Sequence, residues 1–549
     1  MFNKSAVSSL VIGLMAAGSA IADTSIQQGG EVTIPAIGTG FVENFNPYTV
    51  KDLMAGTMYE PLFIHNGKTG EIEPRLAESI TVADDLMSVT VKVRPDLKWS
   101  DGTPLTAEDV AYSYNMTKET RAFDVKGIWG DAGKLDSVTA TDETTVVFKM
   151  NAADSTFVWG LKDYFIVPKH IWGEVENLTT FTNPNPVGNG PFTEVALMRA
   201  QQMKLCRNPH YWQAAEGRPY LDCVVARSYN DNSQIQAALM KGEIDWGSNF
   251  IADIDKTFVE ADPENNHYWY PGNDAIHLYM NTKAAPFDNL EVRRALSMSL
   301  DRELIVDIAA YGYPTPNHYL GGLGDYFDSY VDKDIEKKYS QYTSYDPEQA
   351  AAILDKAGYT DKNGDGFRQL PNGDAISFDI EVVNGWTDWV QSVQIVTEMF
   401  EEVGIKANVK TVDWSVYDKN LKDGNYAMSI NWSNTNNAHP IQSYQDYFAA
   451  SAVGTSWHAS HGIFSKDMSE LIESFGSTND AAEQTRIINT LQEFTAENMP
   501  FIPLFSNPTW FQYRTEKVVG WPNAENPYIH PNYYQADKKV KIFDNLHQK

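Results

Sequence analysis

The chain has 549 residues and a formal net charge of −30 at neutral pH. A chain of this length exceeds what one hydrophobic core normally holds, so we expect two or three domains. The acidic balance and the lack of a basic stripe argue against nucleic acid as a partner, because carboxylates repel phosphates.

The first residues have the pattern of a secretory signal peptide. Lys4 precedes an apolar run over residues 6–17, and Ala20-Ile21-Ala22 has the small-x-small form that a signal peptidase cuts. The run is too short to span a bilayer. We therefore expect a signal peptide over residues 1–22, cleaved after Ala22. No cysteine lies near that site, so a periplasmic protein without a lipid anchor is expected.

The sequence contains two cysteines, Cys206 and Cys223. An even number in an exported chain favours a disulfide, and the spacing differs from that of a redox-active C-x-x-C pair. Closing a loop of this size stabilises a fold by about 3 kcal/mol. We expect a structural disulfide here.

Capping residues and apolar spacing predict several helices in chain order. A hydroxyl cap followed by acids predicts one from Thr106. Residues 288–300 have helical spacing, and Asp346-Pro347 opens a third helix that ends at Gly358. The fourth carries an apolar stripe formed by Trp389, Val393, Val396, Phe400 and Val403, and it ends at Gly404.

Two stretches alternate as strands do, residues 405–409 and 426–430. Helices and strands that follow one another in this way predict an α/β protein with layered sheets.

Six blocks, taken in order, resemble the dipeptide/oligopeptide class of extracellular solute-binding proteins, known as family 5. The most specific is Lys98-Trp99-Ser100-Asp101-Gly102-Thr103-Pro104 followed by Thr106-Ala107-Glu108-Asp109-Val110. The others are Tyr59-Glu60-Pro61-Leu62 with Pro74-Arg75-Leu76-Ala77-Glu78-Ser79, Pro186 to Phe192, Asn208 to Trp212, Val292 to Leu296 with Asp301-Arg302, and Met499 to Leu504.

The resemblance implies a two-lobed "Venus flytrap" fold with an extra inserted domain, in which a ligand sits between closing lobes and an ABC importer recognises the closed form. Lobe I is expected to comprise residues 23–63, 187–281 and 508–549. The inserted domain is expected over 64–186 and lobe II over 282–507. It also implies a monomeric receptor that is not an enzyme, needs no cofactor or metal, and has a small-molecule ligand and inner-membrane permease subunits as partners.

The family name suggests a peptide ligand, but the residues indicate another class. Peptide-binding members place an aspartate after the strand that corresponds to residues 426–432, where it pairs with the α-ammonium of the peptide. The stretch from Asn431 to Pro440 contains four asparagines and no carboxylate. Amides both donate and accept hydrogen bonds without charge, which suits a neutral ligand covered in hydroxyls.

Two further blocks, residues 384–389 and 519–527, resemble the chitin- and cello-oligosaccharide-binding branch of the same family. We therefore expect a neutral β-linked oligosaccharide, with an oligopeptide or dipeptide as the alternative. Another neutral solute or a metal complex would be a third class. A secreted hydrolase is not expected, because no catalytic motif is found and, although carboxylates are plentiful, the family resemblance gives no support for a glycosidase pair.

Candidate ligand-binding residues follow from that branch. Trp386 precedes a helix, off its apolar stripe, and is expected as a platform for a sugar ring. Trp389 is expected in the core. Asp388 is expected to cap the helix, to accept a hydrogen bond from a sugar hydroxyl, or to do both. Trp521, in a Gly-Trp-Pro loop, is expected as a second platform.

The remaining candidates are polar residues and rim tryptophans. Asn431 should point away from the apolar face of its strand, whereas Trp432 fits the core and the rim equally well. The others are Asn230 and Asn232, between a strand and a helix, and Trp457 and His458, at the mouth of the site. Residues 361–372 begin like a calcium-binding loop, but Asn372 stands where a bidentate glutamate is required, so a glycine-rich hairpin is expected.

Overall fold

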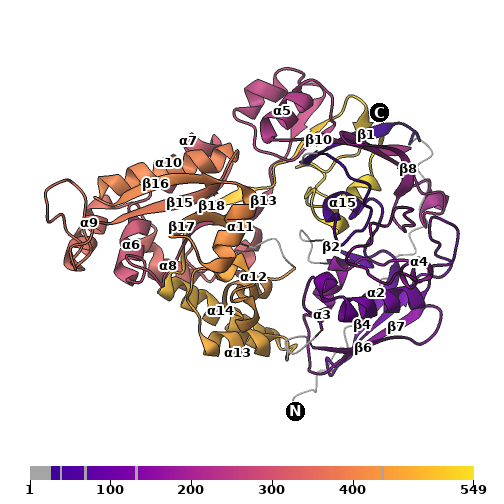
Figure 1. Cartoon of the computed structure of the whole chain (residues 1–549), viewed down its shortest axis with the longest axis horizontal. Helices are drawn as coiled ribbons and strands as arrows, with labels where there is room; N and C mark the ends of the chain where they lie inside the picture. The colour runs from indigo at the N-terminus through magenta and orange to yellow at the C-terminus, as the bar shows by residue number, and fades with distance from the viewer. Residues whose placement is uncertain (1–25, 38–39, 67–70, 130–133, 434–437) are drawn as a thin grey trace, which may run out of the picture.

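The structure is a computed structural model that describes residues 26–37, 40–66, 71–129, 134–433 and 438–549. The expected signal peptide lies outside the described residues. Figure 1 shows two bodies side by side, with lobe II on the left and lobe I above the inserted domain on the right. Within the described residues, no helix combines the length and apolar character needed to cross a bilayer.

Lobe I is built on a four-stranded sheet of order β1-β10-β9-β8 in which β1 and β10 run parallel. Smaller sheets join β11 and β12 to β19, and β20 to β21. The strands are β1 (Glu31–Ile37), β8 (Phe192–Arg199), β9 (Gln202–Arg207), β10 (Cys223–Tyr229), β11 (Trp246–Gly247), β12 (Asn266–Tyr268), β19 (Gln512–Arg514), β20 (Val518–Val519) and β21 (His547–Gln548), and the helices are α1 (Lys51–Met54), α5 (Asn232–Met240) and α15 (Ala536–Phe543).

The inserted domain has its own sheet, of order β4-β5-β7-β6, and its own apolar core. Its first long helix begins as predicted, because Thr106 and Asp109 form a reciprocal capping box. Its elements are β2 (Phe63–Asn66), β3 (Glu71–Pro74), β4 (Ala77–Val82), β5 (Ser88–Val93), β6 (Leu135–Ala140), β7 (Thr145–Met150), α2 (Ala107–Glu119), α3 (Phe157–Gly160), the short turn η2 (Leu161–Asp163) and α4 (Lys169–Trp172).

Lobe II surrounds a six-stranded sheet of order β14-β18-β13-β17-β15-β16. Its strands are β13 (Gly272–Met280), β14 (Thr315–Pro316), β15 (Ser377–Val383), β16 (Lys406–Val412), β17 (Met428–Trp432) and β18 (Phe501–Pro508). Its helices are α6 (Leu290–Met298), α7 (Arg302–Ala310), α8 (Lys333–Tyr339), α9 (Pro347–Lys356), α10 (Thr387–Glu402), α11 (Trp414–Asp423), α12 (Pro440–Phe448), α13 (Lys466–Phe475) and α14 (Ala481–Asn498), with short turns η5 (Asp325–Tyr330) and η8 (Trp457–Ala459).

The helices predicted in this lobe are confirmed. Asp346 caps α9 and Pro347 occupies its first turn. The apolar stripe of α10 is buried, and the chain after it turns at Gly404 with a φ of 75°. These local signals agree with the tertiary packing, which is why the sequence predicts them well.

The chain crosses between the lobes at two adjacent points. The backbone N–H of Thr509 donates to the carbonyl of Pro271 at 2.8 Å, just before β13 and just after β18. The expected boundary after residue 281 is therefore wrong, because β13 pairs with β17 and β18 and belongs to lobe II. Sequence motifs do not show which sheet a boundary strand joins.

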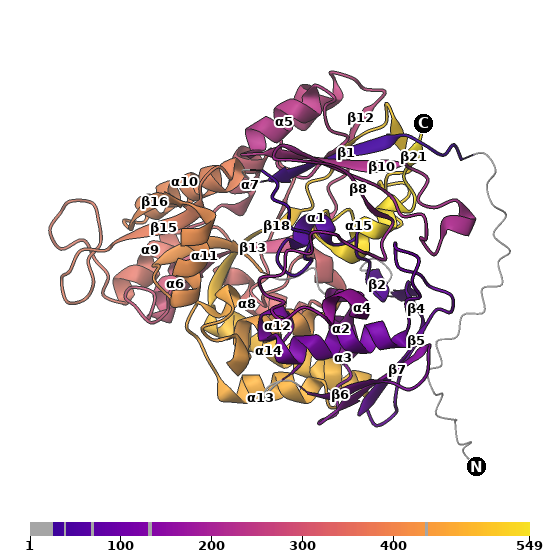
Figure 2. The ribbon, with the colours of Figure 1, turned by 45° about the vertical axis from the view of Figure 1, so that its right-hand side comes forward.

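The inserted domain also contacts lobe II, on the far side from these crossings. The N–H of Ser155 donates to the carbonyl of Gly476 at 2.7 Å, and the rings of Trp159 and His439 stack at 5.3 Å. Figure 2 shows α3 of the inserted domain close to α12 of lobe II. The two lobes thus meet both at the chain crossings and at this contact.

The predicted disulfide is confirmed. Cys206 on β9 and Cys223 on β10 are direct cross-strand partners with Cα atoms 4.0 Å apart. Replacing both by serine should lower the free energy of unfolding by about 3 kcal/mol, because the unfolded chain regains the freedom of the closed loop. Urea denaturation of the variant and of reduced wild type should give the same loss. A wild-type protein whose mass is unchanged by reduction would contradict the pairing.

Candidate functional site

Three neighbouring parallel strands of lobe II end next to a tryptophan. Trp386 follows β15, Trp414 follows β16, and Trp432 is the last residue of β17. Because the carboxyl ends of parallel strands meet at one edge of a sheet, these side chains come together there. In open α/β sheets this edge is where ligands bind.

Five tryptophans form one cluster at this edge: Trp386, Trp389, Trp414, Trp432 and Trp457. Ring centroids are 4.8 Å apart between Trp386 and Trp432 and 4.6 Å apart between Trp389 and Trp432. Trp414 lies 5.7 Å from Trp386, and Trp457 lies 5.6 Å from Trp432. We call this set the tryptophan cluster.

The cluster has a buried base and an open side. Trp389 is 2 % exposed and packs in the lobe II core, as predicted, whereas Trp414 is 46 % exposed. Trp386, Trp432 and Trp457 are partly buried against the same core. The open side therefore offers aromatic surface that is held in place from beneath.

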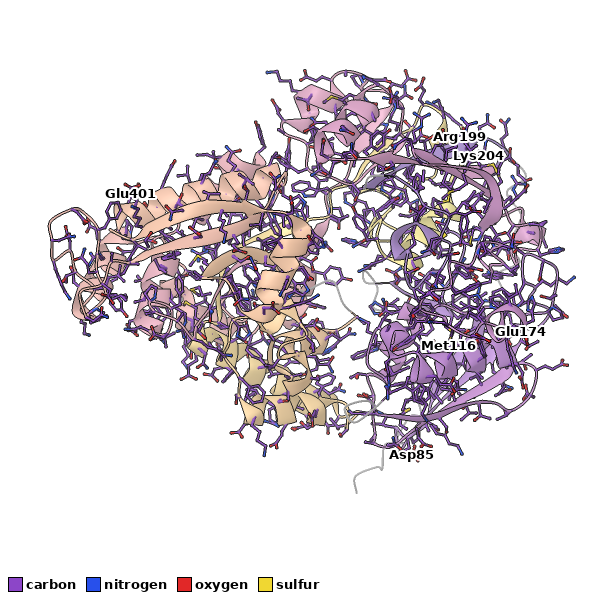
Figure 3. The ribbon with its side chains drawn as sticks, viewed as in Figure 1. Asp85, Met116, Glu174, Arg199, Lys204 and Glu401 are labelled. Carbon is purple, nitrogen blue, oxygen red and sulfur yellow. A yellow bond between two sulfur atoms is a disulfide. The ribbon has the colours of Figure 1, made fainter. Side chains whose placement is uncertain are left out.

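The open side belongs to the part of lobe II that is directed toward lobe I. Figure 3 places Glu401, near the end of α10, at the far side of lobe II, so the start of α10 at Trp386 lies at the end nearer lobe I. Figure 1 likewise shows α11, which begins at Trp414, on the side directed toward lobe I.

Asp388 lies in the first turn of α10, beside the cluster, and Trp386 takes the capping position that was one alternative for Asp388. Burial raises the pKa of Asp388 to about 6, which outweighs the hydrogen bonds from the backbone N–H groups of Trp389 and of Asp388 itself. A carboxylate held in this way can accept hydrogen bonds from a ligand.

The raised pKa of Asp388 predicts a pH-dependent stability. The folded state holds the proton more tightly than the unfolded chain, whose pKa is 3.8, so ionisation lowers stability as the pH rises from about 4 to about 6. Asp388→Asn should therefore be more stable than wild type above that window, by up to about 3 kcal/mol. Urea denaturation between pH 4 and 8 measures this gap, and a gap that does not change with pH would contradict the burial of the charge.

Two predicted polar contacts are wrong in this structure. Asn431 is fully buried, because β17 is an inner strand whose two faces are both covered, and its side-chain oxygen accepts from the N–H of Trp432 at 2.8 Å. His458 lies beneath Trp457 with ring centroids 4.5 Å apart, and burial lowers its pKa. His458 supports Trp457 and does not line the mouth of the site.

The second expected platform, Trp521, is also wrong. Its side chain is 3 % exposed in the lobe I core, 5.5 Å from the ring of Trp246. Its Nε1 donates to the carbonyls of Arg514 and Val518 at 3.2 and 3.0 Å. No face of the ring is free to stack on a sugar.

On lobe I, Asn230 is exposed and Asn232 begins α5, and neither side chain contacts the tryptophan cluster. A small hollow lies nearby, lined by the carboxyl end of β1, by Ile235 of α5, by Ser248 after β11 and by Tyr534. Tyr534 is 45 % exposed. This hollow occupies the strand-end position in lobe I that the cluster occupies in lobe II.

Sequence reasoning missed Trp414 and Tyr534. Trp414 follows a predicted strand in the same way that Trp386 does, and that repetition was the signal available. For Tyr534 no comparable signal exists.

The 361–372 loop is an exposed turn in which Asp361 accepts from the backbone N–H groups of Gly364 and Gly366, and no metal-binding group of side chains is found in the part of the chain described.

Comparison with known proteins decides the family. Residues 71–455, more than half of the chain, match the family model for bacterial extracellular solute-binding proteins, family 5, middle region. The chain belongs to this family. Family 5 proteins are receptors for ABC importers and not enzymes, so the chain is a substrate-binding protein of an ABC importer.

Curated relatives cover nearly the whole chain. The oligopeptide-binding protein AppA of Bacillus subtilis is 27 % identical over 539 residues, which cover 93 % of this chain and 92 % of AppA. Heme-binding protein A of Haemophilus influenzae is 26 % identical over 84 % of each chain. Members with similar sequences are thus named for different ligands.

A solved structure from Thermotoga maritima confirms the two-lobed fold. It is a periplasmic oligopeptide-binding protein of an oligopeptide ABC transporter with mannohexaose bound. Its TM-score is 0.83 at 28 % identity, and the match covers 94 % of this chain and 98 % of that one. The predicted α/β fold of periplasmic binding proteins is therefore correct, and the extracellular family is consistent with a periplasmic location.

Proposed function

We propose that this receptor captures a neutral β-linked oligosaccharide, a fragment of chitin or cellulose type, between its two lobes and delivers it to an inner-membrane permease. The observation that carries the proposal is the tryptophan cluster at the carboxyl edge of the lobe II sheet, with the ring of Trp414 46 % exposed.

The physical basis is the shape of β-linked sugars. Their rings present apolar C–H faces that stack on aromatic rings, while the hydroxyls at the edges bind polar side chains. The cluster supplies several ring faces, and the buried carboxylate of Asp388 lies at the start of the same helix. The Thermotoga maritima neighbour, which holds mannohexaose, supports a sugar in this family.

A peptide is the second candidate. The carboxylate of Asp388 could pair with the α-ammonium of a peptide, and AppA of Bacillus subtilis is named as an oligopeptide-binding protein. The two candidates differ in one respect that can be measured: a peptide brings a charge to Asp388, whereas a sugar brings hydroxyls.

Calorimetric titration of the mature protein tests the proposal. The panel contains chitotetraose, cellotetraose, mannohexaose and unstructured peptides of three to nine residues. We expect binding of at least one β-linked sugar, no binding of peptides, and no sugar cleavage after prolonged incubation. Peptide binding without any response to the sugars would overturn the proposal.

A further inference from the structure

We propose that Lys538 of lobe I and Tyr326 of lobe II form a polar subsite that binds hydroxyl groups of the ligand across from the tryptophan cluster. This inference rests on the proposed function and names the part of lobe I that takes part in it.

Lys538 is a buried lysine without a partner. It lies on α15 and is 2 % exposed, yet its ammonium has no hydrogen bond and no ion pair with any described residue. Its neighbours on the helix are satisfied: Lys541 pairs with Glu73 at 2.8 Å, and the ammonium of Lys539 lies 4.7 Å from the centroid of the Tyr533 ring. A buried ammonium that is not solvated costs free energy, so such groups are normally paired.

Lys538 interacts electrostatically with Asp274, a residue at the edge of lobe II that carries the tryptophan cluster. The carbonyl of Ala275 accepts from the N–H and the hydroxyl of Ser433, the residue after Trp432, at 2.8 and 2.9 Å. Asp274 therefore lies at the edge where Trp432 lies. Asp274 acts electrostatically on Lys538, which places the ammonium across the boundary between the lobes from this edge.

Tyr326 brings a second unsatisfied group to the same place. Its buried hydroxyl has no hydrogen-bond partner in the described structure. Asp274, Asp537 and Lys162 act on this hydroxyl, and the same three groups act on Lys538. Two donors from different lobes thus lack acceptors in one small region.

The charges of the region disfavour an anionic ligand. Two lysines, Lys162 and Lys538, are set against Asp163, Asp274 and Asp537, which leaves one net negative charge, and His65 is neutral because burial lowers its pKa to about 4. An anionic ligand gains little from such a balance. A hydroxyl both accepts from an ammonium and donates to a carboxylate, so a polyhydroxylated ring matches the groups present.

The subsite also has a cost for the free protein. Burial lowers the pKa of Lys538 to about 8, which shows that the charged form is disfavoured where it lies. Buried charged groups that lower the stability of the free protein are typical of binding sites, where activity often requires a less stable arrangement. Lys538→Met should therefore raise the melting temperature of the free protein.

The experiment combines melting curves with calorimetric titration of chitotetraose and cellotetraose. Lys538→Met should bind the preferred sugar at least tenfold more weakly than wild type while melting at a higher temperature. Tyr326→Phe should weaken binding about threefold to tenfold. The control, Lys541→Met, removes the same charge from the same helix and should bind within twofold of wild type.

Equal sugar affinities of wild type and Lys538→Met would overturn the inference. The buried lysine would then have a structural role or be solvated by a buried water. A lower melting temperature for Lys538→Met would show an ion-pair role and overturn it as well. A wild-type protein that binds neither sugar would overturn the proposed function first, and the subsite for hydroxyls with it.

Discussion

Replacing Trp414 by alanine should weaken oligosaccharide binding about thirtyfold and leave the melting temperature of the free protein nearly unchanged. Truncating an aromatic anchor in a binding site typically costs about 2 kcal/mol or more of binding energy, and 1.4 kcal/mol corresponds to a factor of ten. The side chain is 46 % exposed at the start of α11, where alanine is a good helix former, so little folding energy is lost.

A matched control is available in the same lobe. Tyr345 is also 46 % exposed and lies just before α9, and Figure 1 shows α9 at the end of lobe II remote from lobe I. Tyr345→Ala should bind the sugar within twofold of wild type. Equal affinity for wild type and Trp414→Ala would show that the exposed ring does not contact the ligand.

Replacing Trp389 by alanine should lower the free energy of unfolding by about 3–5 kcal/mol, because it removes a buried ring from the lobe II core. The side chain is 2 % exposed, and its ring lies 5.1 Å from that of Trp386 and 4.6 Å from that of Trp432. The loss should appear in urea denaturation as a lower midpoint with an unchanged slope.

Binding should also weaken in Trp389→Ala, because the partly exposed rings of Trp386 and Trp432 lose their support. Trp414→Ala serves for comparison, because it should weaken sugar binding while leaving the stability of the fold unchanged. A Trp389→Ala protein of wild-type stability would mean that the base of the cluster is not packed as the structure has it.

Local signals account for most of what the sequence predicted correctly. The stripe of α10 placed Trp389 in the core and left Trp386 outside it, and Thr106 and Asp346 marked helix starts. These features depend on residues close in sequence. The disulfide was predicted from the cysteine number and the expected export, and the cross-strand geometry agrees with it.

The errors came from contacts between distant segments. Trp521 lies in a Gly-Trp-Pro loop that looks exposed, but Arg514 and Trp246 enclose it in lobe I. Asn431 does alternate with its apolar neighbours, yet its strand is covered on both faces, so alternation does not expose it. Burial of both faces depends on the segments that pack on the two sides of the sheet, which a single strand's pattern does not contain.

The most direct test of the account is a crystal structure of the mature protein with chitotetraose or cellotetraose, whichever binds more tightly. We expect a sugar ring stacked on the exposed part of the tryptophan cluster, at Trp414 or Trp386, with its hydroxyls near Asp388. A sugar bound elsewhere, with the cluster covered by protein side chains in the closed form, would contradict the assignment of this edge as the ligand-binding site.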